Sequence, residues 1–221
     1  MLAGDVGAAP AQALGFDCDT ILTKSLAAEF SGQEFDFVVR YLPRDGVVTP
    51  TAPQGCLTAP EAENILAGGL ALMAVQHVAS PPWTPSAALG QTYGTYAVLN
   101  AEAIGLPAGI NIWLDLEGVA SGVSPQTVAA YCSAWYDIVS NAGFAPGLYV
   151  GANCGLDGDQ LAALPFRYFW QSGSTTPTPT GIGYCMSQSI SSSYVLGGVA
   201  YDLDTVFTDQ TQKTPIWLAP P

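Results

Sequence analysis

The feature that most constrains this chain is a strand-like run that ends in two carboxylates just before a glycine. Apolar residues alternate along it with mostly polar ones, in the order Ile110, Asn111, Ile112, Trp113, Leu114, Asp115, Leu116 and Glu117. This alternation predicts a β-strand with one apolar face. Side chains two residues apart on a strand point the same way, with Cα atoms about 7 Å apart. We therefore expect Asp115 and Glu117 to share one pocket.

Two carboxyl groups in one pocket favour acid–base chemistry. Repulsion between like charges raises the pKa of one group, which then holds a proton beside an ionised partner. Hydrolysis of a glycosidic bond needs that combination. A solvated strand face would also explain the alternation, and the spacing alone supports both interpretations about equally.

Length and composition restrict the classes of protein that remain. The 221 residues fit one domain within the usual range of an α/β barrel. A net charge of −13 with only five Lys plus Arg argues against nucleic acid or an anionic membrane as a partner. No run approaches the roughly 18 consecutive apolar residues of a membrane span. The first 14 residues lack the pattern of a secretory signal.

The cysteines and the single histidine give no sign of a metal or cofactor site. The histidine is His77, which we expect to be a hydrogen-bonded core or rim residue. The five cysteines are scattered without a close pair, and we expect them to be small buried side chains with at least one free thiol. They are Cys18, Cys56, Cys132, Cys154 and Cys185. The sequence therefore predicts neither a metal nor a cofactor.

Strand-like and helix-like segments alternate through most of the chain. The strands are predicted at about residues 13–17, 35–42, 70–78, 110–118, 147–151, 168–171, 184–188 and 199–204. Helices are predicted at about 22–30, 58–68, 86–104, 124–143 and 156–164, the second opening with a capping box. This order predicts an α/β fold with a single (β/α)8 TIM-type barrel, degenerate because helices are missing or short after the sixth and seventh strands.

The two ends of the chain are predicted to lie outside the barrel. Residues 1–13 form an N-terminal arm, residues 14–209 the barrel and residues 210–221 an extended, Pro-rich tail. The Ser/Thr/Pro stretch 172–180 is followed at once by strand signals, so we interpret it as a surface loop rather than a linker.

Carboxylates recur where predicted strands end. Asp17 ends the first strand, Asp115 and Glu117 end the fourth, and Asp202 or Asp204 ends the last. Active sites of such barrels lie at the carboxyl ends of the strands, and the first and last strands are neighbours where the barrel closes. One strand-end Asp is more often a turn former, but together these residues favour a glycosidase.

Several of these segments carry a family resemblance. They are the Gly-Phe-Asp at 15–17, the Asp115-x-Glu117 strand, Gly-Leu-Tyr-Val-Gly at 147–151, Gln188 and Tyr-Asp-Leu-Asp at 201–204. They resemble the glycoside-hydrolase-like family once catalogued as domain of unknown function 1906, itself similar to the family 25 lysozymes of bacteria and phages. The resemblance runs from about residue 14 to 208.

The resemblance implies a lysozyme-type barrel that cuts the β-1,4 bond between N-acetylmuramic acid and N-acetylglucosamine in peptidoglycan. Glu117 would be the general acid. Asp115 would be its ionised partner, which stabilises an oxocarbenium-like state or an acetamido-assisted intermediate. Asp17 and Asp202 would be auxiliary carboxylates that position the substrate and tune pKa values.

Other residues are candidates for substrate binding. Gln188 and Asp204 lie at predicted strand ends and could contact the glycan, although Gln188 could equally bridge neighbouring side chains. Trp113, Tyr149 and Trp170 could form walls on which sugars stack, but core packing is the commoner fate of strand aromatics.

Two further residues stand apart from these candidates. Arg40 could pair with a carboxylate at the barrel mouth and keep it ionised, the alternative being a surface Arg at a strand end. Trp83, in a Pro-rich loop, is expected to be exposed.

A second class of function stays open. The barrel could be an inactive glycan-binding or structural component, for example of a phage tail or another delivery assembly, with partners bound through the two terminal arms. Its place of action would be the cell envelope or the extracellular space, reached by a phage or a secretion machine. A catalyst needs an open groove with Glu117 reachable, whereas a scaffold could have it filled by the 172–180 loop.

Overall fold

The chain forms a closed eight-stranded barrel in a computed structural model that describes residues 1–47 and 55–221. Around the barrel the strands follow the order β2-β3-β4-β5-β6-β7-β8-β11. Each strand pairs with the next, including β4 with β5, and pairing of β11 with β2 closes the barrel. The strands are β2 (Leu14–Asp17), β3 (Phe37–Leu42), β4 (Ala71–Gln76), β5 (Asn111–Leu116), β6 (Ala145–Val150), β7 (Tyr168–Gln171), β8 (Met186–Ser189) and β11 (Asp202–Val206). The predicted TIM-type barrel is confirmed.

The last barrel strand departs from the all-parallel pattern. β11 runs antiparallel to both β2 and β8, whereas every other neighbouring pair in the barrel is parallel. Asp202 therefore begins its strand instead of ending it, contrary to the expectation from the sequence. Its register still pairs Asp202 with Asp17, so the two aspartates lie at the same end of the barrel.

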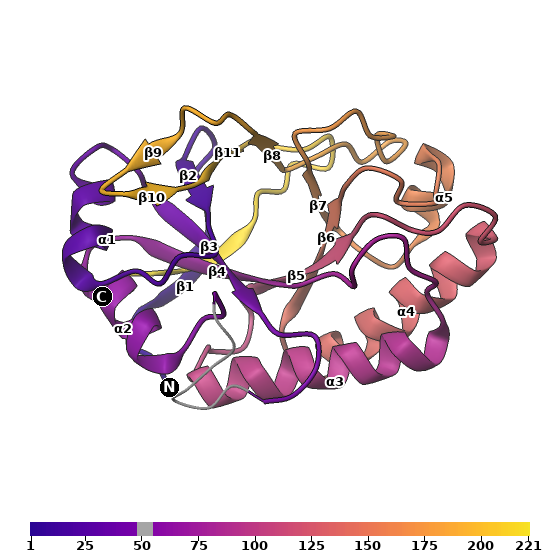
Figure 1. Cartoon of the computed structure of the whole chain (residues 1–221), viewed down its shortest axis with the longest axis horizontal. Coiled ribbons are helices and arrows are strands. Elements are labelled where there is room, and N and C mark those ends of the chain that lie inside the picture. Colours follow the sequence, from indigo (N-terminus) through magenta and orange to yellow (C-terminus); the bar gives the residue numbers. More distant parts are fainter. Residues whose placement is uncertain (48–54) are drawn as a thin grey trace.

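Within the described residues, five helices cover the barrel on part of its circumference. They are α1 (Lys24–Ser31), α2 (Ala59–Ala67), α3 (Ala87–Ile104), α4 (Pro125–Asn141) and the short α5 (Gly158–Ala163). In Figure 1, α1 and α2 lie at the left, and the long helices α3 and α4, which run parallel to each other, lie along the bottom. Each of the first four begins at a Ser or Thr whose side chain accepts a backbone N–H, as helix starts require.

The described residues contain no helix after β7 or after β8, as the sequence predicted. The chain after β8 instead forms the small hairpin of β9 (Val195–Leu196) and β10 (Val199–Ala200). This hairpin lies beside α1, β2 and β11 in Figure 1. The side of the barrel built by β7, β8 and β11 is therefore covered by loops.

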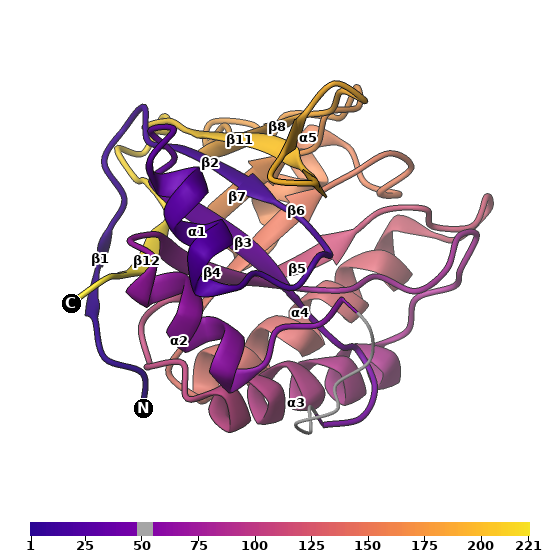
Figure 2. The ribbon, with the colours of Figure 1, turned by 60° about the vertical axis from the view of Figure 1, so that its left-hand side comes forward.

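The two terminal segments pair with each other. β1 (Asp5–Ala8) is antiparallel to β12 (Ile216–Ala219), and β12 pairs with β4 through Leu218 and Leu72. The Asn111 Oδ1 accepts a hydrogen bond of 2.5 Å from the Ile216 backbone N–H. Figure 2 shows the two strands side by side at the edge of the molecule. The predicted arm and tail are extended, and their backbones are bonded to this chain's own barrel.

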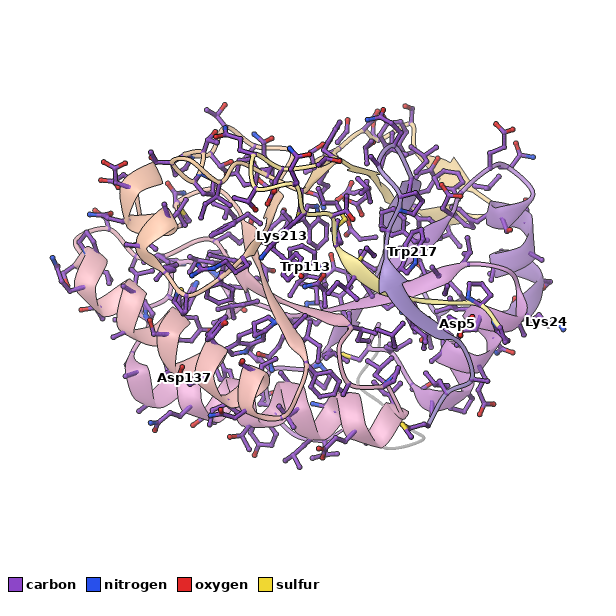
Figure 3. All side chains as sticks on the ribbon, turned by 180° about the vertical axis from the view of Figure 1, so that it is seen from behind. Asp5, Lys24, Trp113, Asp137, Lys213 and Trp217 are labelled. Carbon is purple, nitrogen blue, oxygen red and sulfur yellow. The ribbon has the colours of Figure 1, made fainter. Side chains whose placement is uncertain are left out.

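The alternation seen in the sequence of β5 separates two apolar layers. Ile112, Leu114 and Leu116 belong to the layer between the barrel and its helices. Trp113 lies in the second layer, inside the barrel, together with Phe37 and Trp170. Figure 3 shows Trp113 in the interior of the molecule. The mixed face of β5 therefore faces the barrel interior, with Asp115 further along the strand than Trp113, toward the mouth.

Candidate active site

The carboxylates predicted from the sequence meet at one mouth of the barrel. Asp17, Asp115, Glu117 and Asp202 all line a cavity of about 610 Å³. Three of them, Asp115, Glu117 and Asp202, also line a smaller adjoining cavity of about 200 Å³. The side chains come from β2, from β5 and the residue just after it, and from β11, so the closed sheet brings together residues far apart in the chain.

Glu117 is the half-buried member of the group. It follows the last residue of β5 and lines both cavities. Burial raises the pKa of its carboxyl above the ordinary value. The carboxyl lies against the backbone of Gly151, where a Cβ would come within 2.5 Å of the Glu117 Cβ. A group that holds its proton and is reachable from a cavity can act as a general acid.

Trp83 supports the backbone that carries Glu117. The Trp83 indole N–H donates a 2.6 Å hydrogen bond to the Glu117 backbone carbonyl, and the Trp83 backbone N–H donates one to the Gly118 carbonyl at 3.2 Å. Trp83 packs edge-on against Tyr131 and is buried. The expectation that Trp83 would be exposed is therefore wrong, because the loop folds back onto the end of β5.

Asp115 is more deeply buried than Glu117. Burial is the largest cause that raises its pKa well above the ordinary value, and the charge of Glu117 adds to it. Its Oδ1 is buried and has no hydrogen-bond partner among the described residues. In the unliganded protein Asp115 therefore holds a proton more readily than an exposed aspartate, which differs from the ionised state expected from the resemblance.

Asp17 is held by a frame of hydrogen bonds. The Tyr41 hydroxyl donates to its Oδ1 at 2.7 Å, and the Gln188 amide donates to its Oδ2 at 2.7 Å. Burial nevertheless raises the pKa of Asp17 to about 6. The Gln188 Oε1 accepts a further bond from the Tyr149 hydroxyl at 2.9 Å. Gln188 thus bridges neighbouring side chains, one of its two predicted roles.

The two aspartates of β11 have different positions. Asp202 lines both cavities and is only partly buried. Asp204 is fully buried beneath them, and its Oδ1 accepts a hydrogen bond from the Trp170 indole at 3.0 Å. Burial, followed by the charge of Asp17, raises the pKa of Asp204 well above its ordinary value. Asp204 is therefore placed to hold a proton beneath the site and has no surface with which to touch a substrate.

The predicted sugar-stacking walls lie mostly in the barrel interior. Trp113 is fully buried and packs edge-on against Trp170, which is also buried. Trp170 and Tyr149 line the smaller cavity, Trp113 neither of the two. The prediction of a sugar-stacking wall is wrong for Trp113, which packs in the core because its ring fills the barrel over Gly147, where no side chain competes for the space.

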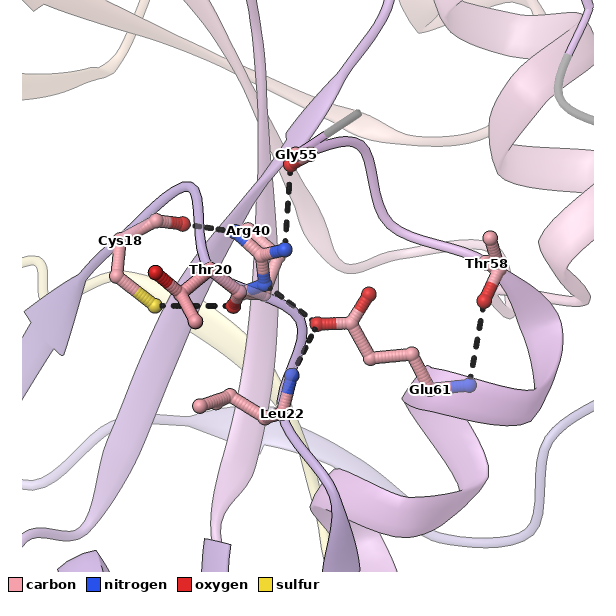
Figure 4. A network of polar contacts seen from close by, with 7 residues as sticks. All are labelled: Cys18, Thr20, Leu22, Arg40, Gly55, Thr58 and Glu61. Atoms are coloured by element: carbon pink, nitrogen blue, oxygen red, sulfur yellow. Dashed lines mark hydrogen bonds and ion pairs between the residues drawn. The ribbon is translucent and has the colours of Figure 1, made fainter. Parts of the chain in front are cut away.

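Arg40 pairs away from the mouth. Its guanidinium lies 2.8 Å from the Glu61 carboxylate on α2, and both side chains are buried. It also donates hydrogen bonds to the carbonyls of Cys18 and Gly55, and Glu61 accepts one from the Leu22 N–H (Figure 4). The predicted partnership with a mouth carboxylate is wrong. The Glu61 side chain points to Arg40, so only the Thr58 half of the predicted capping box forms.

Sequence reasoning missed the aromatic side chains that do reach the larger cavity. Tyr41 and His77 stack with ring centroids 4.4 Å apart, and Tyr194 stacks on Tyr201 at 5.6 Å. All four line the cavity, as does the exposed Ile190. The sequence does show Tyr41 near the end of a predicted strand and two tyrosines that flank Gly197–Gly198. Only the closed barrel brings these tyrosines to the same cavity.

The described residues contain neither a metal-binding cluster nor a membrane-spanning helix. Within residues 1–47 and 55–221, no cluster of three or more His, Cys, Asp or Glu side chains is arranged to hold a metal ion. No helix in the described part of the chain has the length and apolar character needed to cross a bilayer. All five cysteines are buried, as the sequence predicted, and all five are free thiols.

Comparison with known proteins gives one family and several structures of the same fold. The family model of the Rv2525c-like, glycoside hydrolase-like domain matches residues 28–215. No curated protein matches the chain. The Tat-secreted protein Rv2525c of Mycobacterium tuberculosis, in complex with L-tartrate, has a TM-score of 0.64 at 16% identity, over 91% of this chain and 100% of that one.

Two further similar structures are the catalytic domain of an endolysin and a modular autolysin. The catalytic domain of endolysin ply40 from bacteriophage P40 of Listeria monocytogenes has a TM-score of 0.58 at 16% identity, over 90% of this chain and 94% of that one. The modular autolysin LytC of Streptococcus pneumoniae, in complex with a synthetic peptidoglycan ligand, has a TM-score of 0.58 at 12% identity, over 92% of this chain and 46% of that one. At these identities the likeness concerns the fold.

Proposed function

The chain belongs to the family of Rv2525c-like, glycoside hydrolase-like domains, and from that premise we propose that it is a glycoside hydrolase of the lysozyme type. Its substrate would be the glycan strand of peptidoglycan, cleaved by carboxylic acid catalysis without a cofactor. Such a protein would act at the cell envelope or outside the cell. The observation that carries the proposal is the convergence of Asp17, Asp115, Glu117 and Asp202 on one open cavity.

Glu117 is proposed as the general acid because it combines access with a raised pKa. It lines both cavities, is half-buried, and burial favours its protonated form. Such a group can donate a proton to the leaving glycosidic oxygen, an effect that contributes typically about 10²–10⁴-fold to the rate. The Trp83 indole and Gly151 hold the backbone and carboxyl in place.

Asp115 is proposed as the group that contacts the reacting sugar from inside the mouth. Its Oδ1 lacks a partner in the described residues, and it lines both cavities. An N–H donor on the substrate, such as that of an acetamido group, would satisfy this oxygen. A hydrogen bond donated to the ionised carboxylate lowers its pKa. Substrate binding would thereby create the ionised partner that an oxocarbenium-like transition state needs.

Asp17 and Asp202 are proposed as auxiliary carboxylates on the neighbouring strands β2 and β11. They face each other in register across β2 and β11. Asp17 is oriented by Tyr41 and Gln188, so it is a rigid acceptor, while the more exposed Asp202 lines both cavities. Their role would be to position hydroxyl groups of the sugar rather than to transfer the proton.

Release of reducing ends from purified peptidoglycan and from chitin oligomers tests this function. Wild-type protein should release them, and Glu117→Gln should not, because an amide of the same shape cannot donate the proton. Circular dichroism and thermal melting of both proteins control for folding. Absence of release by folded wild-type protein on both substrates would refute the hydrolase assignment, and retained release by Glu117→Gln would refute the choice of acid.

A further inference from the structure

The cleft contains more carboxyl groups than the two that the proposed catalysis uses directly, Glu117 and Asp115. Five carboxyl residues line the larger cavity, with Asp19 at its rim in addition to the four already described. No Lys or Arg is among the described residues that line either cavity. The only basic side chain there is His77, whose pKa is lowered by burial and by Arg44. The residues that line the cleft therefore bring carboxyl groups without a lysine or arginine, and the cleft becomes negative as those carboxyl groups ionise.

All five Lys and Arg side chains of the sequence are placed, and none lines the cleft. Arg40 is buried in its pair with Glu61, and Arg44 donates to the Val78 carbonyl at 2.9 Å. The other three lie elsewhere, Lys24 at the start of α1, Arg167 bonded to the Phe166 carbonyl, and Lys213 over the Tyr168 ring. A net charge of −13 adds a negative long-range field to the local one.

The cleft also contains a carboxyl oxygen, the Asp115 Oδ1, that has no hydrogen-bond partner among the described residues. The buried Asp115 Oδ1 lacks a hydrogen-bond partner in the described part of the chain, and its side chain lines both cavities. When Asp115 is ionised, this oxygen can be satisfied by an N–H or ammonium group of a ligand but not by a ligand carboxylate, which has no hydrogen to donate. The adjoining wall of Tyr194 and Tyr201 offers aromatic surface that suits the apolar face of a sugar and a nearby cation alike.

We propose that this cleft selects its glycan by charge, so that chains with free ammonium groups bind more tightly than uncharged chains, and chains with free carboxylates bind most weakly. The inference rests on the proposed function only in taking the ligand to be an amino-sugar glycan. Within peptidoglycan it singles out strands whose sugars have lost acetyl groups or whose carboxylates are blocked as amides. Fully carboxylated strands would be repelled by Asp17, Asp19 and Asp202.

Calorimetric titration of the Glu117→Gln protein, which binds without cleaving, tests the order. The ligands are chitin oligomers, their N-deacetylated counterparts of equal length, and peptide-free peptidoglycan oligomers with the free lactyl carboxylate. Near pH 7 and at low salt, where Asp17 with its pKa of about 6 is mostly ionised, each step of the order should change the dissociation constant by about fivefold or more, since one exposed charge pair contributes roughly that factor. High salt should reduce both differences in dissociation constant because it screens the charges.

Two matched variants locate the selecting charge. Asp19→Asn, in the same Glu117→Gln background, removes one charge at the rim of the cavity and should reduce the differences in dissociation constant between the three ligands. Asp137→Asn removes one charge from the exposed face of α4, far from the mouth, and should leave the order unchanged (Figure 3). An identical effect of the two variants would assign the selection to net charge and overturn the role of the cleft.

The outcomes separate this inference from the proposed function. Equal or tighter binding of the carboxylate oligomer, or binding of none of the three ligands, overturns the charge selection even if the wild type releases reducing ends from peptidoglycan. The predicted order without any hydrolysis by the wild type upholds the selection and refutes the hydrolase.

Discussion

The Glu117 carboxyl lies directly over the backbone of Gly151, the first residue after β6. A Cβ on Gly151 would come within 2.5 Å of the Glu117 Cβ and 3.1 Å of its carboxyl carbon. Gly151 has no positive φ, so space rather than backbone conformation is what demands glycine there. The position of the proposed acid thus depends on the absence of one methyl group on the neighbouring strand.

Gly151→Ala should therefore displace Glu117 and reduce hydrolysis by about 10²-fold or more, because a misplaced acid loses its alignment. Overpacking should cost about 1–3 kcal/mol of unfolding free energy. The measurement is kcat for reducing-end release beside urea denaturation. Gly7→Ala is the matched control, since a Cβ at Gly7 meets nothing within 4 Å. Full activity of Gly151→Ala would show that the acid does not need this contact.

Stability should fall as the pH rises from about 4 toward 7. The pKa of Asp17 is about 6 in the folded protein against an ordinary 3.8, and burial also raises the pKa values of Asp115 and Asp204 well above the ordinary one. The folded state therefore binds more protons than the unfolded state, so its stability is full below the unfolded pKa and is lost as the pH passes the folded one. Asp17 alone accounts for roughly 3 kcal/mol.

Urea denaturation at a series of pH values measures this dependence, and Asp204→Asn should flatten it. The amide oxygen of Asn can still accept the Trp170 indole N–H that now bonds to Asp204, while the buried titrating group is gone. A wild-type protein that is more stable at pH 7 than at pH 4 would contradict the prediction.

The buried pair of Arg40 and Glu61 should matter for stability and not for chemistry. Arg40→Met leaves the Glu61 carboxylate buried without its cation, and Glu61→Leu leaves the guanidinium alone, so each should cost about 3–5 kcal/mol. The double variant should cost less than the sum of the two. Chemical denaturation of the three proteins tests this double-mutant cycle, and strictly additive costs would refute the coupling.

Tyr194→Ala should weaken substrate binding without unfolding the protein. The Tyr194 ring lines the larger cavity and stacks only on Tyr201 among the described rings. Loss of one aromatic contact of about 0.5–1.5 kcal/mol predicts a KM rise of roughly two- to tenfold with little change in kcat. Tyr96→Ala, on the far helix α3, is the control. An unchanged KM would remove Tyr194 from the binding surface.

The sequence by itself determined the barrel and the strand that carries its two central carboxylates. The two-residue period of β5 placed Ile112 and Leu114 under the helices and Asp115 inside the mouth, because side chains of a strand alternate between faces. Loop composition after β7 and β8 correctly indicated missing helices, since helix periodicity is absent there.

Only the tertiary structure decided what surrounds those carboxylates. The antiparallel direction of β11, the pair of Arg40 with Glu61 and the burial of Trp83 each depend on contacts between segments distant in sequence. The direction of the pKa shift of Asp115 likewise follows from burial more than from the adjacent Glu117. Local patterns fix which face a side chain lies on, whereas the closure of the sheet fixes its partners, its access to water and therefore its charge.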